Sequence, residues 1–484
     1  MKILQDILYK VRLDAVQGST QVAVRNLHFD SRKVGLDDVF IAIRGVGADG
    51  HLFIEKAVNA GAIAIICEEF PTILVNGVTY VKVSDSAEAL AWMASNYYDQ
   101  PSTKLKLVGI TGTNGKTTVA SLCYQLFQKA GYVCGLLSTV KVMVGNETFQ
   151  ATHTTPDPIA INHYLNEMVQ AGVTYCFMEV SSHGIQQNRI TGLDFDGAVF
   201  TNLTHDHLDY HKTFAAYRDV KKSFFDGLPK NAFALTNIDD KNGEVMVQNS
   251  RAKIKSYALK SYADYRGQVL ESQLSGLLLK INEQEVWVKL IGQFNAYNLL
   301  AIYGIAIELG MTDLEALRYL SELESVSGRF QYVISPNKIT AIVDYAHTPD
   351  ALQNVIDTIN DLRTKNESFI TIVGCGGDRD KAKRPEMAAI AANGSTQVIL
   401  TSDNPRTEDP MQILKEMEAG VPPQHFKKVL SNVDREQAIK MACQMAKPQD
   451  IILIAGKGHE NYQEINGVKH PFDDMEIVKK YLNQ

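Results

Sequence analysis

The stretch GITGTNGKTT, residues 109–118, decides how the rest of the chain is interpreted. It follows the apolar run LKLV and precedes the helix-like segment VASLCYQLFQKAG, which is the strand–loop–helix setting of a phosphate-binding loop. Gly112 and Gly115 allow a tight turn that directs N–H groups at phosphate oxygens, and the helix adds its positive N-terminal end. Lys116 would reach the terminal phosphates, and a threonine hydroxyl after it would hold Mg²⁺.

The loop departs from the usual spacing at one position. A glycine is expected five residues before Gly115, and this position holds Ile110. The departure weighs against a generic kinase or GTPase loop but not against a family that uses a shorter form. The structural alternative is a glycine turn between a strand and a helix.

Length and composition are those of a multidomain globular protein. A chain of 484 residues is too long for one ordinary core, so we expect two to three domains. The net charge of -7 argues against a general nucleic-acid binder. No apolar run approaches the ~18 residues of a membrane span, and the charged N-terminus MKILQDILYKV does not suit a signal peptide. The six scattered cysteines form no CxxC pair, so we expect buried thiols in a reducing cytoplasm.

Short apolar runs alternate with helical stretches along the whole chain, which predicts mostly parallel sheets. Residues 1–98 contain VFIAI, AIAIIC and TYVKV, residues 99–331 contain LKLVGI, YCFMEV, GAVFTN and AFALTN, and residues 332–484 contain TAIVDY, FITIVG, TQVILTS and DIILIAG. We therefore predict an α/β protein of three domains with these boundaries. A smaller N-terminal α/β domain precedes a central P-loop ATPase domain with a mostly parallel sheet and a C-terminal Rossmann-like domain.

The phosphate loop and ten further motifs resemble the Mur ligase family, in the family's order and over nearly the whole chain. The motifs are DSR (30–32), HTTPD (153–157), MEVSSHG (178–184), NLTHDHLDYH (202–211), GQFNAYN (292–298), SGRF (327–330), DYAHTPD (344–350), GCGGDRDKAKRPEM (374–387), DNPRTEDP (403–410) and AGKGHE (455–460). The resemblance implies a cytoplasmic, ATP-dependent, amide-forming ligase of peptidoglycan precursor synthesis, and thus a role in cell-wall biogenesis, cell division and cell shape.

Such a ligase phosphorylates a carboxylate with ATP, and an amine then attacks the acyl phosphate. Divalent metal neutralises the two anions that must meet. The resemblance gives catalytic or Mg²⁺-binding roles to Lys116, Thr117, Glu179, His207 and Lys221. Glu179 ends the expected strand YCFMEV, at the carboxyl edge where ligands collect in α/β sheets.

Two of these assignments compete with other interpretations. HDHLDYH has the residue types of a zinc cluster, but it lacks cysteine and the spacing of a structural zinc site, and the resemblance instead assigns His207 to a second Mg²⁺. In YRDVKKSFF, the family pattern K-x-x-L/F-F selects Lys221 as a lysine at the start of a helix that carries a carbamate made from CO₂ (N6-carboxylysine). It shares a helix face with Phe224 and Phe225; the alternative is an ordinary surface lysine.

The resemblance places ATP on the loop, on the helix of FNAYNLL and at the boundary of the second and third domains. Asn295 and Asn298 share one helix face, and amides can pair with purine edges, although Asn295 could instead cap the helix. The implied ATP-binding residues are Gly112, Thr113, Asn114, Gly115, Lys116, Thr117, Thr118, Asn295, Asn298, Arg329, Asp344 and His347.

The resemblance also implies sites for a sugar nucleotide, UDP-N-acetylmuramoyl-L-alanyl-D-glutamate, and for an amino acid. Because the guanidinium of Arg189 can pair bidentately with anions, it is the least replaceable residue of the first site. In this ligase group DNPR accompanies meso-diaminopimelate, whose extra carboxylate Arg406 can clamp, whereas an unpaired arginine disfavours lysine. The implied residues are Ser31, Arg32, Thr154, Thr155, Ser181, Gln187 and Arg189 for the sugar nucleotide, and Arg379, Asp403, Asn404, Arg406, Gly456 and Glu460 for diaminopimelate.

We therefore expect a monomeric ligase that uses ATP and Mg²⁺ to add meso-diaminopimelate to the sugar nucleotide, without a nucleic-acid partner or a membrane span. Addition of L-lysine and a folylpolyglutamate-type ligase are alternatives of the same chemical class; the latter should lack DNPR and the N-terminal DSR unit. A regulatory P-loop ATPase that binds a sugar nucleotide without ligating it is the alternative from another class.

Overall fold

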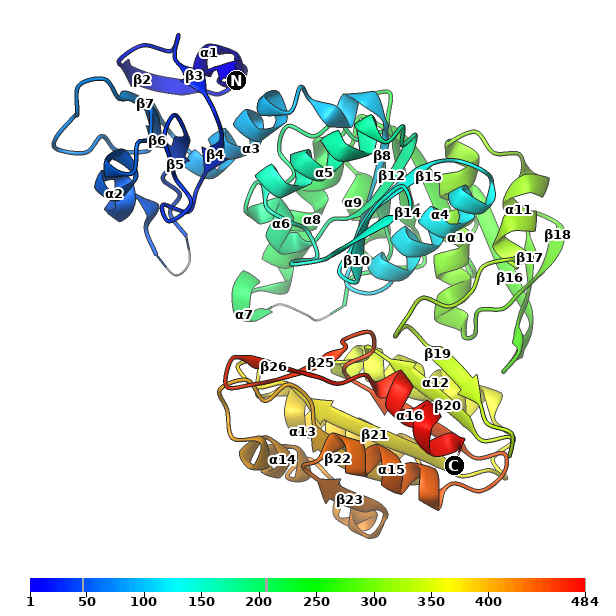
Figure 1. The fold of residues 1–484 in the computed structure, drawn as a ribbon. Coiled ribbons are helices and arrows are strands. Elements are labelled where there is room, and N and C mark those ends of the chain that lie inside the picture. The colour runs from blue at the N-terminus through cyan, green and yellow to red at the C-terminus, as the bar shows by residue number, and fades with distance from the viewer. Residues whose placement is uncertain (46–47, 205–207, 484) are drawn as a thin grey trace.

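The computed structural model describes residues 1–45, 48–204 and 208–483, with the side chains of 208 and 209 left aside. The chain folds into three successive α/β domains, each built on a sheet of its own with helices packed against it (Figure 1). This confirms the predicted fold class. Within the described ranges, no helix combines the length and the apolar character that crossing a membrane requires.

The N-terminal sheet has the strand order β2-β7-β6-β5-β4, with β2 antiparallel at one edge and the others parallel. Its strands Val39–Ile41 and Ala64–Cys67 are buried on both faces, as expected of apolar runs in a parallel sheet. The elements are β1 (Lys2–Ile3), α1 (Leu4–Ile7), β2 (Leu13–Gln17), β3 (Ala23–Val24), β4 (Leu27–His28), β5 (Val39–Ile41), η1 (Gly50–Phe53), α2 (Ile54–Asn59), β6 (Ala64–Cys67), β7 (Thr79–Val83) and α3 (Ser86–Tyr97).

The central sheet has the order β11-β10-β9-β12-β8-β13-β14-β15-β16-β17-β18, parallel from β9 to β16. Antiparallel extensions at both edges, β10–β11 and β16–β18, were not predicted from the sequence. The elements are η2 (Pro101–Lys104), β8 (Lys106–Thr111), α4 (Lys116–Lys129), β9 (Cys134–Leu137), β10 (Lys141–Val144), β11 (Glu147–Gln150), α5 (Pro158–Gln170), β12 (Tyr175–Glu179), α6 (Ser182–Gln186), β13 (Gly197–Phe200), α7 (Leu208–His211), α8 (Phe214–Asp226), β14 (Phe233–Asn237), α9 (Gly243–Val247), β15 (Lys253–Ala258), β16 (Tyr265–Gln273), β17 (Gly276–Ile281), β18 (Gln284–Val288), α10 (Gln293–Glu308) and α11 (Asp313–Ser321).

The C-terminal sheet has the order β19-β20-β24-β21-β22-β23, with β19 antiparallel at one edge. Apolar clusters fill both of its faces. The elements are β19 (Gln331–Ile334), β20 (Thr340–Asp344), α12 (Pro349–Leu362), β21 (Phe369–Cys375), α13 (Lys383–Gly394), β22 (Gln397–Ser402), α14 (Pro410–Glu418), η3 (Pro423–Lys428), β23 (Val429–Asn432), α15 (Arg435–Met445), β24 (Ile451–Ala455), β25 (Tyr462–Ile465), β26 (Val468–Pro471) and α16 (Asp474–Leu482).

Motif after motif begins where a parallel strand ends. The phosphate loop follows β8, Glu179 is the last residue of β12, and Asp344 is the last residue of β20. DNPR follows β22 and GKGHE follows β24. Because the carboxyl ends of parallel strands share one sheet edge, segments far apart in sequence are brought to one place.

The six cysteines are all free thiols in the structure. In the described part of the chain they form no disulfide; Cys67, Cys123, Cys134, Cys176 and Cys375 are buried. Cys443 is only partly buried, which corrects the expectation that every thiol would be buried.

Candidate functional site

A cavity of about 700 Å³ lies between the central and C-terminal sheets. The phosphate loop and Glu179 form its wall on one side. The other side is formed by residues 374–376, 379, 380, 382, 383, 386, 403, 404 and 406. A second cavity of about 370 Å³ lies against the same loop and is lined by the start of α10 and by α12. Both cavities are therefore lined by Asn114, Gly115 and Thr118 of the loop.

The phosphate loop has the geometry that the sequence predicts. Gly115 has φ of +87° and caps α4, and a Cβ there would lie 2.6 Å from Oδ1 of Asn298. A side chain at Gly115 would therefore collide with the adjoining helix. Nζ of Lys116 donates to the carbonyls of Gly112 at 3.0 Å and Thr113 at 2.7 Å, so the lysine lies over the loop.

Glu179 is fully buried and faces the loop. Its carboxylate accepts hydrogen bonds from the Thr117 hydroxyl at 3.0 Å and from the backbone N–H of Thr139 at 2.7 Å. The Thr139 hydroxyl donates to it as well, at 3.2 Å. Thr139 was missed by the sequence analysis because it lies 40 residues away in a loop with no motif. A buried carboxylate beside a hydroxyl is an all-oxygen donor pair.

The buried Glu179 carboxylate and the Thr117 hydroxyl beside it are oxygen donors of a kind that fits Mg²⁺. Among the residues that the structure describes, no three His, Cys, Asp or Glu side chains gather in a way that could hold a metal ion. Mg²⁺ is usually bound through one or two carboxylates, with substrate phosphates and water supplying the rest. Glu179 and Thr117 meet that description. His207 lies outside the described residues.

Lys221 of α8 packs against the phosphate loop at Gly112. Its side chain is 1% exposed, and its Nζ donates to the Gly112 carbonyl at 2.9 Å and lies 4.9 Å from the ring centre of Tyr217. The surface-lysine interpretation is therefore wrong for Lys221, whereas Lys222 forms a surface ion pair with Asp226 at 2.7 Å.

The position of Lys221 in its helix also differs from the expectation. It lies in the middle of α8 rather than at the helix start, because the helix begins at Phe214 with Thr213 as its cap. The predicted shared face is confirmed, since Phe224 and Phe225 are buried with it. In the described part of the chain, Lys221 is not among the residues that line the 700 Å³ cavity.

Arg329 joins the two halves of the site. Its Nη2 donates to the Thr117 hydroxyl at 3.1 Å, and its guanidinium lies 4.6 Å from the ring centre of Tyr345. Its buried Nε has no hydrogen-bond partner among the described residues, so a donor remains for an anion. His347 also contacts Tyr345, with ring centres 4.6 Å apart. Burial raises the pKa of Asp344 to about 6, against the opposing effect of Arg329.

The two asparagines of α10 line the 370 Å³ cavity. Asn298 donates to Oδ1 of Asn295 at 3.0 Å, and Asn295 donates to the carbonyl of Ile291 at 2.8 Å. The cap of α10 is Gly292, so the interpretation of Asn295 as the helix cap is wrong. The pocket also contains Asp239, whose carboxylate accepts from the Tyr297 hydroxyl at 2.9 Å and which the sequence analysis missed.

Most residues assigned to the sugar nucleotide form one network beside Glu179. The Thr155 hydroxyl donates to the Glu179 carbonyl at 2.9 Å, and Arg189 donates to the Thr155 carbonyl at 2.6 Å. Both Nε and Nη2 of Arg189 donate to Gln187, at 3.1 and 2.6 Å. Burial lowers the pKa of Arg189. Ser181 caps α6 by accepting from Gly184 at 3.1 Å, so its hydroxyl also has a local structural role.

Thr154, Ser31 and Arg32, which were also assigned to the sugar nucleotide, lie outside the network around Arg189. Thr154 lines the large cavity, and its hydroxyl lies 3.1 Å from the Thr139 hydroxyl. Ser31 is buried in the N-terminal domain, and Arg32 is 79% exposed and paired with Asp30 at 2.8 Å. Among the described residues, neither Ser31 nor Arg32 lines either cavity.

The residues assigned to the amino acid converge on the other wall of the large cavity. Asn404 donates to Glu460 at 2.7 Å, and burial, followed by repulsion from Asp403, raises the pKa of Glu460. Nη1 of Arg406 donates to the Gly377 carbonyl at 2.7 Å. Gly456 lies so close that a Cβ on it would be 2.6 Å from Oδ2 of Asp403.

Lys457 lies behind this wall and contacts two of its residues, and the sequence analysis passed over it. It is fully buried and donates to Oδ1 of Asn404 at 3.2 Å, with Glu460 at 3.4 Å. The sequence could have indicated Lys457, because this residue lies within the motif AGKGHE. Arg379, by contrast, is an exposed residue at the rim and donates to the Asp378 carbonyl at 3.2 Å.

A phosphate loop that faces a pocket of fixed carboxylates and guanidinium groups across one cavity defines an α/β nucleotide-dependent enzyme with room for a second, charged substrate. Profiles of known families agree with that class. "Mur ligase family, catalytic domain" matches residues 23–98, "Mur ligase middle domain" matches 110–306, and "Mur ligase, glutamate ligase domain" matches 328–458.

Full-length relatives extend the match. The UDP-N-acetylmuramoyl-L-alanyl-D-glutamate--2,6-diaminopimelate ligase of Cytophaga hutchinsonii is 56% identical over 481 residues, which is 99% of each chain. The ligase of the same name from Phocaeicola vulgatus is 50% identical over 476 residues, 98% of each chain. A solved structure of a ligase of that name has 33% identity and a TM-score of 0.70, over 99% of this chain and 98% of its own. The chain belongs to the Mur ligase family of ATP-dependent ligases.

Proposed function

We propose that the protein uses ATP to join meso-diaminopimelate to UDP-N-acetylmuramoyl-L-alanyl-D-glutamate, through an acyl phosphate on the glutamate carboxylate. The observation that supports this most directly is the single 700 Å³ cavity, because it is lined both by the phosphate loop and by Arg406. Carboxylate activation and amine attack need both substrates in one enclosed space. The relatives at 50–56% identity carry the same activity in their names.

On the nucleotide side, the loop N–H groups and Lys116 would hold and stabilise the transferring phosphate. Thr117 and Glu179 would hold Mg²⁺, which supplies charge neutralisation between the glutamate carboxylate and the terminal phosphate. Their 3.0 Å contact supports a shared role. We propose His207 as a ligand of a second Mg²⁺, and the further nucleotide contacts are those assigned above to the loop, α10 and the domain boundary.

We propose that Lys221 carries a carbamate. Its burial against the Gly112 carbonyl supports this, because a carbamate nitrogen keeps one N–H that could continue to donate there. The modification would add two oxygens beneath the phosphate loop. The neighbouring Lys222 already has a carboxylate partner and serves as the natural control.

For the sugar nucleotide, we propose that Arg189 binds an anionic group together with Thr154, Thr155, Ser181 and Gln187. Ser31 and Arg32 would contact the uridine end, and their place in the N-terminal domain suits a ligand long enough to extend from that domain to the phosphate loop. On the amino-acid side, Arg406 would take the distal carboxylate, and Asp403 and Glu460 would accept hydrogen bonds from ammonium groups. Arg379, Asn404 and Gly456 would complete the pocket.

We further propose that the enzyme acts as a cytoplasmic monomer in peptidoglycan precursor synthesis. Its domains would be residues 1–98, 99–331 and 332–484. The first boundary falls between α3 and the short segment η2, which supports it, and β19 begins at Gln331, one residue before the proposed second boundary.

The proposal is tested by incubating the protein with ATP, Mg²⁺, the UDP-linked dipeptide and one amino acid at a time, and weighing the product. The expected result is a product heavier by one diaminopimelate residue, with ADP and phosphate released only when both substrates are present. A lysine adduct would reassign the amino acid. ATP hydrolysis without any adduct would overturn the ligase proposal in favour of a regulatory ATPase.

A further inference from the structure

A buried arginine lies behind the wall of the amino-acid pocket. Arg384 at the start of α13 is fully buried, and both its terminal nitrogens donate to Glu408, each at 2.9 Å. It also donates to Glu416 of α14 at 2.6 Å and to the Gly376 carbonyl at 3.2 Å. In the described structure, neither Arg384 nor either glutamate lines the 700 Å³ cavity. The cluster therefore supports the pocket from outside.

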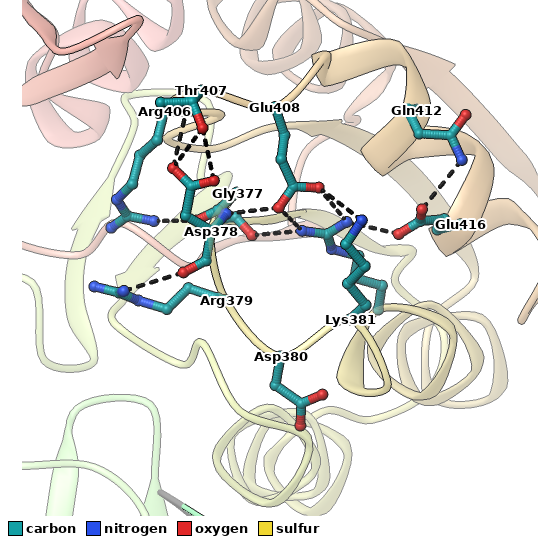
Figure 2. A network of polar contacts seen from close by, with 12 residues as sticks. Gly377, Asp378, Arg379, Asp380, Lys381, Arg406, Thr407, Glu408, Gln412 and Glu416 are labelled. Atoms are coloured by element: carbon teal, nitrogen blue, oxygen red, sulfur yellow. Dashed lines mark hydrogen bonds and ion pairs between the residues drawn. The ribbon is translucent and has the colours of Figure 1, made fainter. Parts of the chain in front are cut away.

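Glu408 connects two loops that do line the cavity (Figure 2). Besides its ion pair with Arg384, its Oε1 accepts from the backbone N–H of Asp378 at 2.6 Å. Lys381 approaches its other oxygen at 3.4 Å. The Arg384 guanidinium holds the pKa of Glu408 down, to about 2, so the carboxylate is ionised at any working pH. One carboxylate thus fixes the loop after β21 to the loop after β22.

Two further contacts join the same loops. The Thr407 hydroxyl donates to the Asp378 carboxylate at 2.8 and 3.0 Å, and Arg406 donates to the Gly377 carbonyl at 2.7 Å (Figure 2). Asp378 and Arg406 have φ of +53° and +51°. This left-handed backbone conformation is uncommon for residues other than glycine, and it persists where surrounding contacts hold it.

We propose that Glu408 is a positioning residue for amino-acid selection. Through Arg384 and the Asp378 N–H it holds loop 376–381 against loop 404–408, and so fixes the direction in which Arg406 and Arg379 point into the cavity. The inference rests on the proposed function and deepens it, because it assigns the geometry of the amino-acid pocket to a cluster that does not touch the substrate.

Loss of the contacts that Glu408 makes with Arg384 and with the Asp378 N–H should weaken binding of the amino acid. Binding of ATP at the phosphate loop should not change. Glu408→Gln keeps the shape of the side chain but removes the charge that pairs with Arg384. Since a displacement of about 1 Å can cost about a hundredfold, we expect KM for diaminopimelate to rise about tenfold to hundredfold. KM for ATP should stay within about twofold, and the preference for diaminopimelate over lysine should fall.

Asp450→Asn is the matched control. Asp450 is equally an acid in the C-terminal domain, and it accepts from the N–H groups of Ser368 and Lys447 at 2.7 and 2.8 Å. It lies before β24, at the opposite end of the strands from the pocket. The same acid-to-amide change there should lower the melting temperature without altering either KM or the preference ratio.

The measurement is steady-state kinetics with each substrate varied in turn, a diaminopimelate–lysine competition, and a thermal melt, on wild type, Glu408→Gln, Glu408→Asp and Asp450→Asn. Glu408→Asp keeps the charge and should recover part of the preference. If Glu408→Gln retains the wild-type KM and preference, or if Asp450→Asn shifts them equally, the positioning role is overturned.

A second variant covers the case in which Glu408→Gln does not fold. Thr407 is exposed, so Thr407→Val removes only the hydroxyl contacts with Asp378 and leaves the Thr407 N–H, which donates to the same carboxylate at 3.3 Å. It should raise KM for diaminopimelate in the same direction by a smaller factor, and an unchanged KM would then overturn the proposal. Failure of the proposed function is recognised separately, because wild type would then form no diaminopimelate adduct.

Discussion

Replacing Arg406 by alanine should change which amino acid the enzyme accepts. The Arg406 side chain is 22% exposed and directs one nitrogen at the Gly377 carbonyl at 2.7 Å. Its backbone has φ of +51°, so alanine keeps a similar conformational cost, whereas glycine would also free the loop. Arg406→Ala therefore isolates the loss of the guanidinium.

The magnitude follows from the burial of the side chain. Truncating one partner of a buried, hydrogen-bonded charge pair costs roughly 2–5 kcal/mol. The partial exposure of Arg406 places the loss near the lower end. At about 1.4 kcal/mol per factor of ten, about 2 kcal/mol lowers kcat/KM for diaminopimelate by roughly 30-fold.

The assay is a competition between diaminopimelate and lysine, with both products weighed, and a separate measurement of KM for ATP. Lysine should gain relative to diaminopimelate, though removing an arginine does not by itself build a lysine site. KM for ATP should hardly change. Arg363→Ala is the control, because Arg363 bonds to Asn360 and the Glu367 carbonyl at the end of α12, outside the residues that line the cavity.

Two results would refute the reasoning. Wild type could prefer lysine, or Arg406→Ala could keep the wild-type preference ratio. In either case the amino-acid assignment fails while the ligase assignment survives, since the phosphate loop and Glu179 do not depend on Arg406.

Three further outcomes test other parts of the site. Lys116→Ala should abolish ligation in a folded protein, as judged by circular dichroism, because the loop lysine stabilises the transferring phosphate; wild-type ATP turnover would contradict this. Lys221→Ala should be nearly inactive and partly rescued by high formate or acetate, whereas Lys222→Ala should stay active, and full activity of Lys221→Ala would exclude the carbamate. Burial raises the pKa of Asp344 from 3.8 to about 6, so the folded state binds this proton more tightly and stability falls as the pH rises from about 4 to 6. Asp344→Asn should remove that loss, up to about 3 kcal/mol, in denaturant titrations at pH 4.5 and 7; an unchanged pH dependence would contradict it.

The elements that the sequence predicted are those whose signal is local. Continuous apolar runs such as AIIC and IILIA became buried parallel strands, and the loop glycines marked the start of α4. Glu179 was expected at a strand end and lies there, because the run before it is apolar and the motif after it begins a helix. In each case, the apolar pattern and the turn residues of one short segment were sufficient to predict the element.

The features that the sequence did not predict depend on contacts between distant segments. The hairpin strands at both edges of the central sheet have weak or mixed patterns, since β11 is exposed along its length. Thr139 has no motif of its own, and its role appears only because the turn after β9 reaches Glu179. The burial of Lys221 in mid-helix likewise depends on α8 packing beneath the phosphate loop, which the sequence of that helix alone does not specify.

The amino-acid pocket likewise depends on contacts between distant segments, so its geometry does not follow from Arg406 alone. DNPR presents Arg406 as one residue in one motif, but its guanidinium is oriented by the carbonyl of Gly377, 29 residues earlier. That loop is in turn held by Glu408, whose partner Arg384 belongs to the motif containing Gly377. The two motifs are thus reciprocally bonded. Arg406 also lies 3.7 Å from the Glu464 carboxylate, and we expect an arginine at 406 to lose part of its orientation in a chain without Glu408 and Arg384. On the proposed positioning role, selection of the amino acid depends on both loops, and we expect substitutions behind the pocket to change it as well as substitutions within it.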